Sequence, residues 1–131
     1  MRAGLSSELA LMRARVVFGR PIGQNQGIYC ELARAYAATE AAALAVREAC
    51  ALFDAGLACG PKANMAKLLA ADALWAAGEA AMQALDGYTL ARNCEVERRW
   101  RETRLDRIAP VSTNLVLAYL VHKVLGLPKS Y

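Results

Sequence analysis

The chain has few residues of the kinds that build metal centres. It contains one histidine and four cysteines among 131 residues, and no two cysteines stand in a C-x-x-C arrangement. A zinc site needs several such ligands at characteristic spacing, so we expect no metal site. A chain of this length does not need disulfides for stability, and the cysteines are therefore interpreted as reduced thiols of a cytoplasmic protein.

Long apolar runs are also absent. No run reaches the roughly 20 residues that a membrane-spanning helix needs. Residues 1–8 contain no apolar stretch of signal-peptide length and are otherwise uninformative. Hydrophobic residues make up 56% of the chain, which excludes a disordered composition. The net charge of +4 is too small to imply nucleic acid or membrane by itself. We expect one domain over residues 1–131.

The apolar residues follow helical spacing, and strand-like alternation bounded by turns is not evident. The longest helix is expected over residues 24–55, where small or apolar residues recur every three or four positions. These positions, called the seam below, are Ile28, Leu32, Ala35, Thr39, Ala42, Val46, Ala49 and Phe53. Glycine and proline separate the other expected helices, at residues 5–18, 62–85, 95–108 and 113–125. The predicted fold is all-α, an antiparallel four-helix bundle with an additional short helix.

A corner at residues 19–23 separates the first two expected helices, because its glycines and proline stop a helix. Arg15 and Phe18 lie three residues apart and are expected on one helix face. Gln26 lies at the start of the next helix. A cation, an aromatic ring and an amide at one corner suit a flat, anionic ligand. A plain corner with a solvated arginine and a buried phenylalanine is the alternative.

Two further places could contact a ligand. Gln83 and Gly87 lie at the end of the helix expected over residues 62–85, where glycine lets backbone approach a ligand and glutamine can bond a ribose or phosphate oxygen. Thr113 lies at the start of the last helix, where free N–H groups can bind an anion. Ordinary helix caps are the alternative reading of both places.

Residues 97–107 contain five arginines with three acidic residues interleaved. The arginines could meet phosphates. However, Glu97 and Arg101 are four apart and form a favourable helical ion pair. The stretch is interpreted as a salt-bridged helix with Trp100 packed in the core. A basic nucleic-acid binder remains an alternative and predicts binding that weakens steeply with salt.

The order and spacing of these groups resemble the C-terminal helical domain of the acyl-CoA dehydrogenase family. The resemblance covers essentially residues 9–131. The matching motifs are Arg15-x-x-Phe18-Gly19-x-Pro21-Ile22 with Gln26, then Met65-Ala66-Lys67, Gln83-x-x-x-Gly87, Val96-Glu97-Arg98-x-x-Arg101-x-x-Arg104, and residues 108–113 running to Leu125-Gly126.

The resemblance implies part of a flavoprotein that oxidises an acyl-CoA thioester to the 2,3-enoyl-CoA. Family members combine an N-terminal helical domain, a middle β domain and a C-terminal bundle. The resemblance also implies that one set of residues contacts the FAD held by a neighbouring subunit, and that Thr113 lies near the flavin of its own site. That set is Arg15, Phe18, Gln26, Gln83 and Gly87. The bundle would then pair with another copy, typically as a dimer of dimers.

Three departures from the family pattern qualify this expectation. Val111 stands two residues before Thr113, where many members carry the catalytic glutamate, and valine cannot accept a proton. Asp86 and Thr89 replace glycines of the family's loop, which argues against close approach of the nucleotide to the backbone there. The N-terminal and β domains are not in this sequence.

We therefore expect a C-terminal domain that contributes FAD contacts and oligomerisation, carries no catalytic residue at Val111 and is inactive alone. It would act on acyl-CoA only as part of a complete enzyme. A non-catalytic helical module for oligomerisation or partner binding is the alternative.

Overall fold

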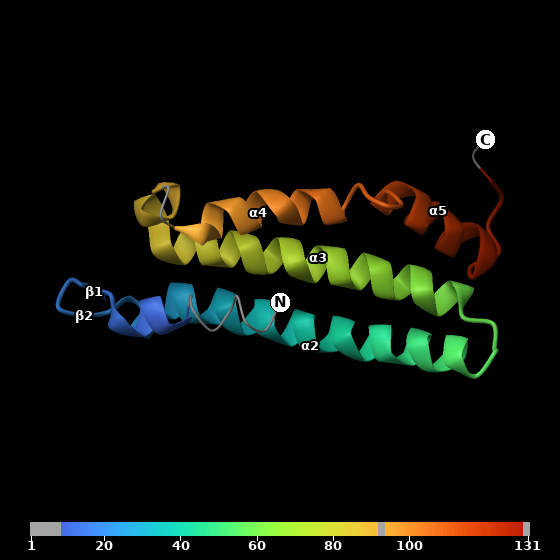
Figure 1. Cartoon of the computed structure of the whole chain (residues 1–131), viewed down its shortest axis with the longest axis horizontal. Coiled ribbons are helices and arrows are strands. Elements are labelled where there is room, and N and C mark those ends of the chain that lie inside the picture. Colours follow the sequence, from blue (N-terminus) through green and yellow to red (C-terminus); the bar gives the residue numbers. More distant parts are fainter. Residues whose placement is uncertain (1–8, 92–93, 130–131) are drawn as a thin grey trace.

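The computed structural model describes residues 9–91 and 94–129, which form an elongated, mostly helical molecule (Figure 1). The elements follow one another as a helical segment at residues 9–14, β1 (Val16–Val17), β2 (Arg20–Pro21), the 3-10 helix η1 (Ile22–Gln24), α2 (Gln26–Asp54), α3 (Gly60–Leu85), the 3-10 helix η2 (Asp86–Leu90), α4 (Glu95–Asp106) and α5 (Thr113–Lys123). The all-α class is confirmed. Within the described residues, no helix combines the length and apolarity needed to cross a lipid bilayer.

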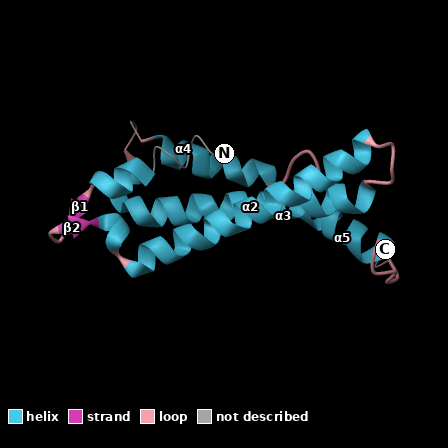
Figure 2. Ribbon diagram, turned by 90° about the horizontal axis from the view of Figure 1, so that it is seen from below, coloured by secondary structure: helices cyan, strands magenta, loops and turns pink. Residues whose placement is uncertain are grey.

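Helix α3 is the central element. It runs antiparallel to α2, and α4 and α5 follow one another along it (Figure 1). The β1–β2 hairpin and α5 lie at opposite ends of the molecule (Figure 2). The buried residues of α2 are all alanines, and α3 also buries mainly alanines. Alanine favours helix, and its small side chain lets neighbouring helices approach closely.

The seam of α2 is largely as expected. Ala35, Ala42 and Ala49 are buried. Val46 and Phe53 were wrongly placed in it, because Val46 is 40% exposed and Phe53 is 72% exposed. The buried stripe steps three residues from Ala49 to Leu52, which is half-buried, and so leaves Phe53 on the outside.

Most helix ends lie at the residues that the sequence indicated. Gly56 follows α2 with a φ of 68°, and a proline lies in the first turn of α3. Asp86 ends α3. Ser112 caps α5, its hydroxyl accepting a hydrogen bond from the Leu115 N–H at 3.4 Å. A cis Ala109–Pro110 bond separates α4 from α5.

The predicted helix over residues 5–18 is wrong at its C-terminal end, and residues 5–8 lie outside the described part of the chain. The expectation that the chain contains no strands is wrong at the same place. The helical segment stops at residue 14, and the chain continues as an antiparallel hairpin that pairs Val16 with Pro21 and Val17 with Arg20. The two valines favour extended backbone. The turn residues Phe18 and Gly19 have φ of 52° and 78°, and a type I′ hairpin turn requires positive φ at both positions.

Helix α4 is the salt-bridged helix that the sequence predicted. Arg101 pairs with Glu97 at 2.5 Å, and Arg98 pairs with Glu102 at 2.7 Å. Trp100 is half-buried and stacks at a tilt on Trp75 of α3, with ring centroids 5.8 Å apart. The ion pairs leave α4 with little unneutralised charge. The nucleic-acid alternative therefore loses its main support.

Candidate functional site

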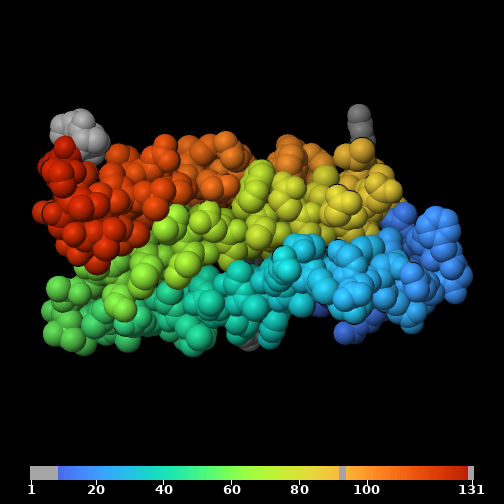
Figure 3. Space-filling model, turned by 180° about the vertical axis from the view of Figure 1, so that it is seen from behind, coloured from blue at the N-terminus to red at the C-terminus, as the bar shows by residue number. Residues whose placement is uncertain are grey.

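Two of the predicted groups meet at one end of the molecule, although they are far apart in sequence. Arg15 Nη1 donates a hydrogen bond to the backbone carbonyl of Leu85 at 2.5 Å. The Arg15 guanidinium also lies over the Tyr88 ring, 5.9 Å from its centroid. The hairpin and η2 are neighbours on the surface (Figure 3, blue and yellow). We call this region, formed by the hairpin, the start of α2, the end of α3 and η2, the hairpin end.

The hairpin end carries two arginines whose hydrogen-bond acceptors are uncharged. Arg15 is bonded to a carbonyl, and Arg20 Nη2 donates to the side-chain oxygen of Asn25 at 2.6 Å. Within the described part of the chain, neither guanidinium has a carboxylate at ion-pair distance. An arginine has five N–H donors, so both retain donors for a ligand. The region is suited to binding an anionic group.

The sequence predicted that Phe18 shares a helix face with Arg15, and this prediction is wrong. The alternative, a buried Phe18, is also wrong. It occupies the tip of the hairpin, where its side chain is 99% exposed. A bulky residue with positive φ is strained, and such strain tends to concentrate at functional positions. An exposed ring on a strained turn is available to a ligand or to another protein surface. Gln26 is the first residue of α2, as predicted, and is exposed.

Gln83 and Gly87 are both exposed, in the last turn of α3 and in η2. A Cβ added at Gly87 would meet nothing within 4 Å. Asp86 adopts a φ of 50° and a ψ of −142°, a conformation that glycine tolerates best. Thr89 is buried, and its hydroxyl donates to the Asp86 carbonyl at 2.7 Å. The Thr89 side chain therefore leaves the outer surface of the loop open at Gly87.

Thr113 and Val111 lie away from the hairpin end. The N–H and the hydroxyl of Thr113 both donate to the carbonyl of Arg107, each at 3.0 Å. These bonds tie the start of α5 back to the end of α4. Val111 lies between these helices and is 43% exposed. The structure therefore does not bring Thr113 together with the other five predicted site residues.

Arg20 and Tyr88 were missed as site residues. The predicted helix over residues 5–18 left Arg20 in the corner that follows it, where nothing in the sequence indicated a role for it in ligand binding. Tyr88 contacts Arg15 across a long stretch of sequence, and no local pattern indicates such a contact.

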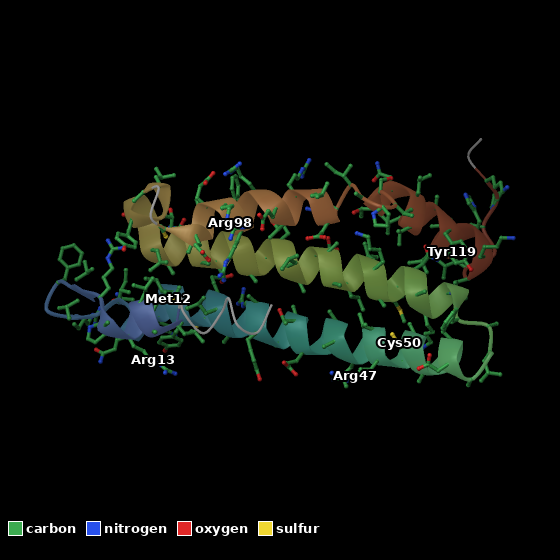
Figure 4. All side chains as sticks on the ribbon, viewed as in Figure 1. Met12, Arg13, Arg47, Cys50, Arg98 and Tyr119 are labelled. Carbon is green, nitrogen blue, oxygen red and sulfur yellow. The ribbon has the colours of Figure 1, made fainter. Side chains whose placement is uncertain are left out.

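A groove of about 500 Å³ lies beside the hairpin end, between the helical segment at residues 9–14 and the first turns of α2. Its walls are mostly apolar and include Met12, Arg13, Tyr29 and Tyr36. None of the predicted site residues lines it. Figure 4 places Met12 between α2 and α3, and Arg13 on the side away from α3.

Comparison with known proteins gives a consistent result. The family model described as "Acyl-CoA dehydrogenase, C-terminal domain" matches residues 1–118. The acyl-CoA dehydrogenase FadE12 of Mycobacterium tuberculosis is 36% identical over 132 residues, which cover 99% of this chain and 34% of the relative. An acyl-CoA dehydrogenase of Bacillus subtilis is 37% identical over 123 residues, covering 94% and 32%. The chain spans about a third of the length of these relatives.

Solved structures share the fold. A glutaryl-coenzyme A dehydrogenase in complex with glutaryl-CoA superposes with a TM-score of 0.89 at 27% identity, covering 98% of this chain and 33% of that chain. The FAD complex of PigA superposes with a TM-score of 0.88 at 25% identity, covering 94% and 32%.

Proposed function

The chain belongs to the acyl-CoA dehydrogenase family, as its C-terminal domain, and on that premise we propose that it supplies FAD contacts and an oligomerisation surface to an FAD-dependent enzyme. The enzyme would dehydrogenate an acyl-CoA thioester between its 2 and 3 carbons. Similar chains of known structure bind FAD in one case and glutaryl-CoA in another. This domain would be inactive without the rest of the enzyme. We place it in the cytoplasm, where its cysteines stay reduced.

The observation that carries the proposal is the bond from Arg15 to the Leu85 carbonyl, which joins the hairpin to the end of α3. The residues present fit an FAD diphosphate and adenosine held by a neighbouring subunit. Arginine supplies charge-assisted donors to phosphate. Gly87 leaves room for close backbone approach, and the proposed contacts are Arg15, Phe18, Gln26, Gln83 and Gly87.

Thr113 is proposed to lie near the flavin of the subunit's own site, at the junction of α4 and α5. The flavin would supply the hydride acceptor of the reaction. Val111 cannot act as the base. The proton of the substrate would therefore be removed by a residue outside this position.

The test is an FAD titration of the chain alone and mixed with a chain that carries the preceding two-thirds of the M. tuberculosis relative. Binding is read by flavin absorbance and fluorescence. We expect binding in the mixture only, followed by flavin bleaching on addition of acyl-CoA. Arg15→Ala should weaken FAD binding in the mixture roughly tenfold or more, since it removes a charge-assisted contact.

Arg13→Ala is the matched control. Arg13 is an exposed arginine of the neighbouring helical segment, but it lines the groove, which contains none of the predicted site residues. Its FAD affinity should equal that of the unsubstituted chain. If the Arg15→Ala variant binds FAD as tightly as the unsubstituted chain does, Arg15 is not an FAD contact. No flavin binding in either sample would favour the second candidate, a non-catalytic oligomerisation module. The large exposed apolar residues on and after α5 support that candidate.

A further inference from the structure

The hairpin geometry places Arg20 on the same face as Arg15. Cross-strand partners share a face, and Val17 is the partner of Arg20. Alternate residues of a strand also share a face, so Arg15 lies on the same face as Val17. The Ile22 N–H donates to the Arg15 carbonyl at 2.8 Å and extends the pairing. Arg15 and Arg20 are therefore diagonal neighbours, at a spacing of about 7–8 Å.

This hairpin face is turned toward the end of α3. Val17 is half-buried and packs against the apolar cluster that contains Ile22 and Leu85. Arg15 reaches the Leu85 carbonyl from the same face. Arg20 thus flanks the place where the hairpin meets α3 and η2.

Asn25 restricts the position of Arg20. Its side-chain oxygen accepts from Arg20 Nη2 at 2.6 Å, while its side-chain nitrogen donates to the Ile22 carbonyl at 3.1 Å. The amide is held at both ends, immediately before α2. It uses one of the five donors of Arg20 and adds no negative charge.

We propose that Arg20 is a second phosphate-binding residue of the hairpin end, which together with Arg15 binds the diphosphate group of a dinucleotide, while Asn25 positions the Arg20 guanidinium. The inference rests on the proposed function and adds a residue to that site. A diphosphate carries two negatively charged phosphates, and two arginines without carboxylate partners match it in charge. Guanidinium groups suit this ligand because they bond phosphate oxygens in pairs.

The test uses the 131-residue chain mixed with the chain that carries the preceding two-thirds of the M. tuberculosis relative. ADP and adenosine are the probes, and binding is followed by the amide chemical shifts of the 131-residue chain in NMR. Arg20→Gln is expected to weaken ADP binding about fivefold and to leave adenosine binding unchanged, because only ADP carries the phosphates. Arg15→Gln should weaken ADP binding at least as much. Arg20→Lys should restore part of the affinity, since lysine keeps the charge without the paired donors.

Arg13→Gln is the control and should bind ADP like the unsubstituted chain. If Arg15→Gln weakens ADP binding and Arg20→Gln does not, the role of Arg20 is wrong while the proposed function stands. If neither variant differs from the control, or if the mixture with the unsubstituted chain gives no response to millimolar ADP, both proposals fail. An equal loss of adenosine and ADP binding in Arg20→Gln would also contradict a phosphate contact.

Discussion

Phe18 combines two features that do not stabilise the fold. Phe18 is 99% exposed, so it makes almost no packing contact in this chain, and its φ of 52° is unfavourable for a bulky residue. Stability alone does not explain a phenylalanine here. We therefore interpret Phe18 as a contact residue for a ligand or another protein surface, as proposed above.

We predict that Phe18→Gly leaves the free energy of unfolding unchanged or raises it by up to about 1 kcal/mol, since relief of the turn outweighs the greater freedom of the unfolded chain. Chemical denaturation measures this change. Phe53→Gly is the matched control, because Phe53 is also exposed but lies in the last turn of α2, where glycine should cost about 1 kcal/mol. A loss of stability in Phe18→Gly comparable to that control would contradict the interpretation.

Asp86 is a second residue with positive φ, and it stands where the family has a glycine. Its φ of 50° shows that the backbone there keeps a conformation that favours glycine, although the glycine is replaced. The sequence alone suggested that the replacement obstructs the approach of a nucleotide. The geometry instead leaves the surface open at Gly87, where an added Cβ would meet nothing within 4 Å.

Among the elements, α4 shows how local charge pattern and long-range contacts combine. Its ion pairs are three or four residues apart and therefore follow from the sequence. Its attachment to α3 depends on contacts between helices. Arg107 pairs with Asp72 at 3.4 Å, and Lys67 Nζ donates to the Asp106 carbonyl at the end of α4. A lysine at that carbonyl also interacts favourably with the helix dipole.

We predict that Lys67→Met lowers the free energy of unfolding by about 0.5–1 kcal/mol, because the C-terminal carbonyls of α4 lose a charged partner. Lys62→Met is the control. Lys62 lies on the same helix but forms an exposed pair with Glu48 at 2.9 Å, a kind of contact that contributes little. Thermal denaturation compares the two variants, and equal effects would show that the contact with α4 is unimportant.

At the scale of the whole molecule, the exposed apolar surface is extensive. Large apolar residues with more than half of their surface exposed occur along α5 and the segment that follows it. They include Leu115, Val124, Leu125 and Leu127. Contiguous apolar patches larger than a few hundred Å² are uncommon on monomeric proteins. The surface is therefore interpreted as one that another protein surface covers.

We predict that the chain self-associates in solution and that Leu115→Glu with Leu125→Glu shifts it toward monomer, because buried carboxylates without partners oppose association. Sedimentation velocity over a range of protein concentrations measures this shift. Leu57→Glu is the control, since Leu57 is similarly exposed but lies in the connection between α2 and α3. A monodisperse monomer at high concentration would contradict the prediction.

The sequence by itself determined the helical elements, because their signals are local. Glycine and proline mark the ends of α2 and α3, alanine spacing marks the face between them, and charges four residues apart mark α4. The family motifs are also local in sequence. Arg15, Phe18, Gln26, Gln83 and Gly87 could therefore be recognised as candidate site residues from their order and spacing along the chain.

Only the tertiary structure decided how these residues are arranged. Residues 15–18 belong to the first half of a hairpin rather than to a helical turn, since the Arg15 carbonyl pairs across the strands and the Arg15 guanidinium reaches the end of α3. The seam leaves Phe53 outside, and Thr113 lies apart from the hairpin end. Such outcomes depend on groups that meet across tens of residues, and no spacing within one segment contains that information.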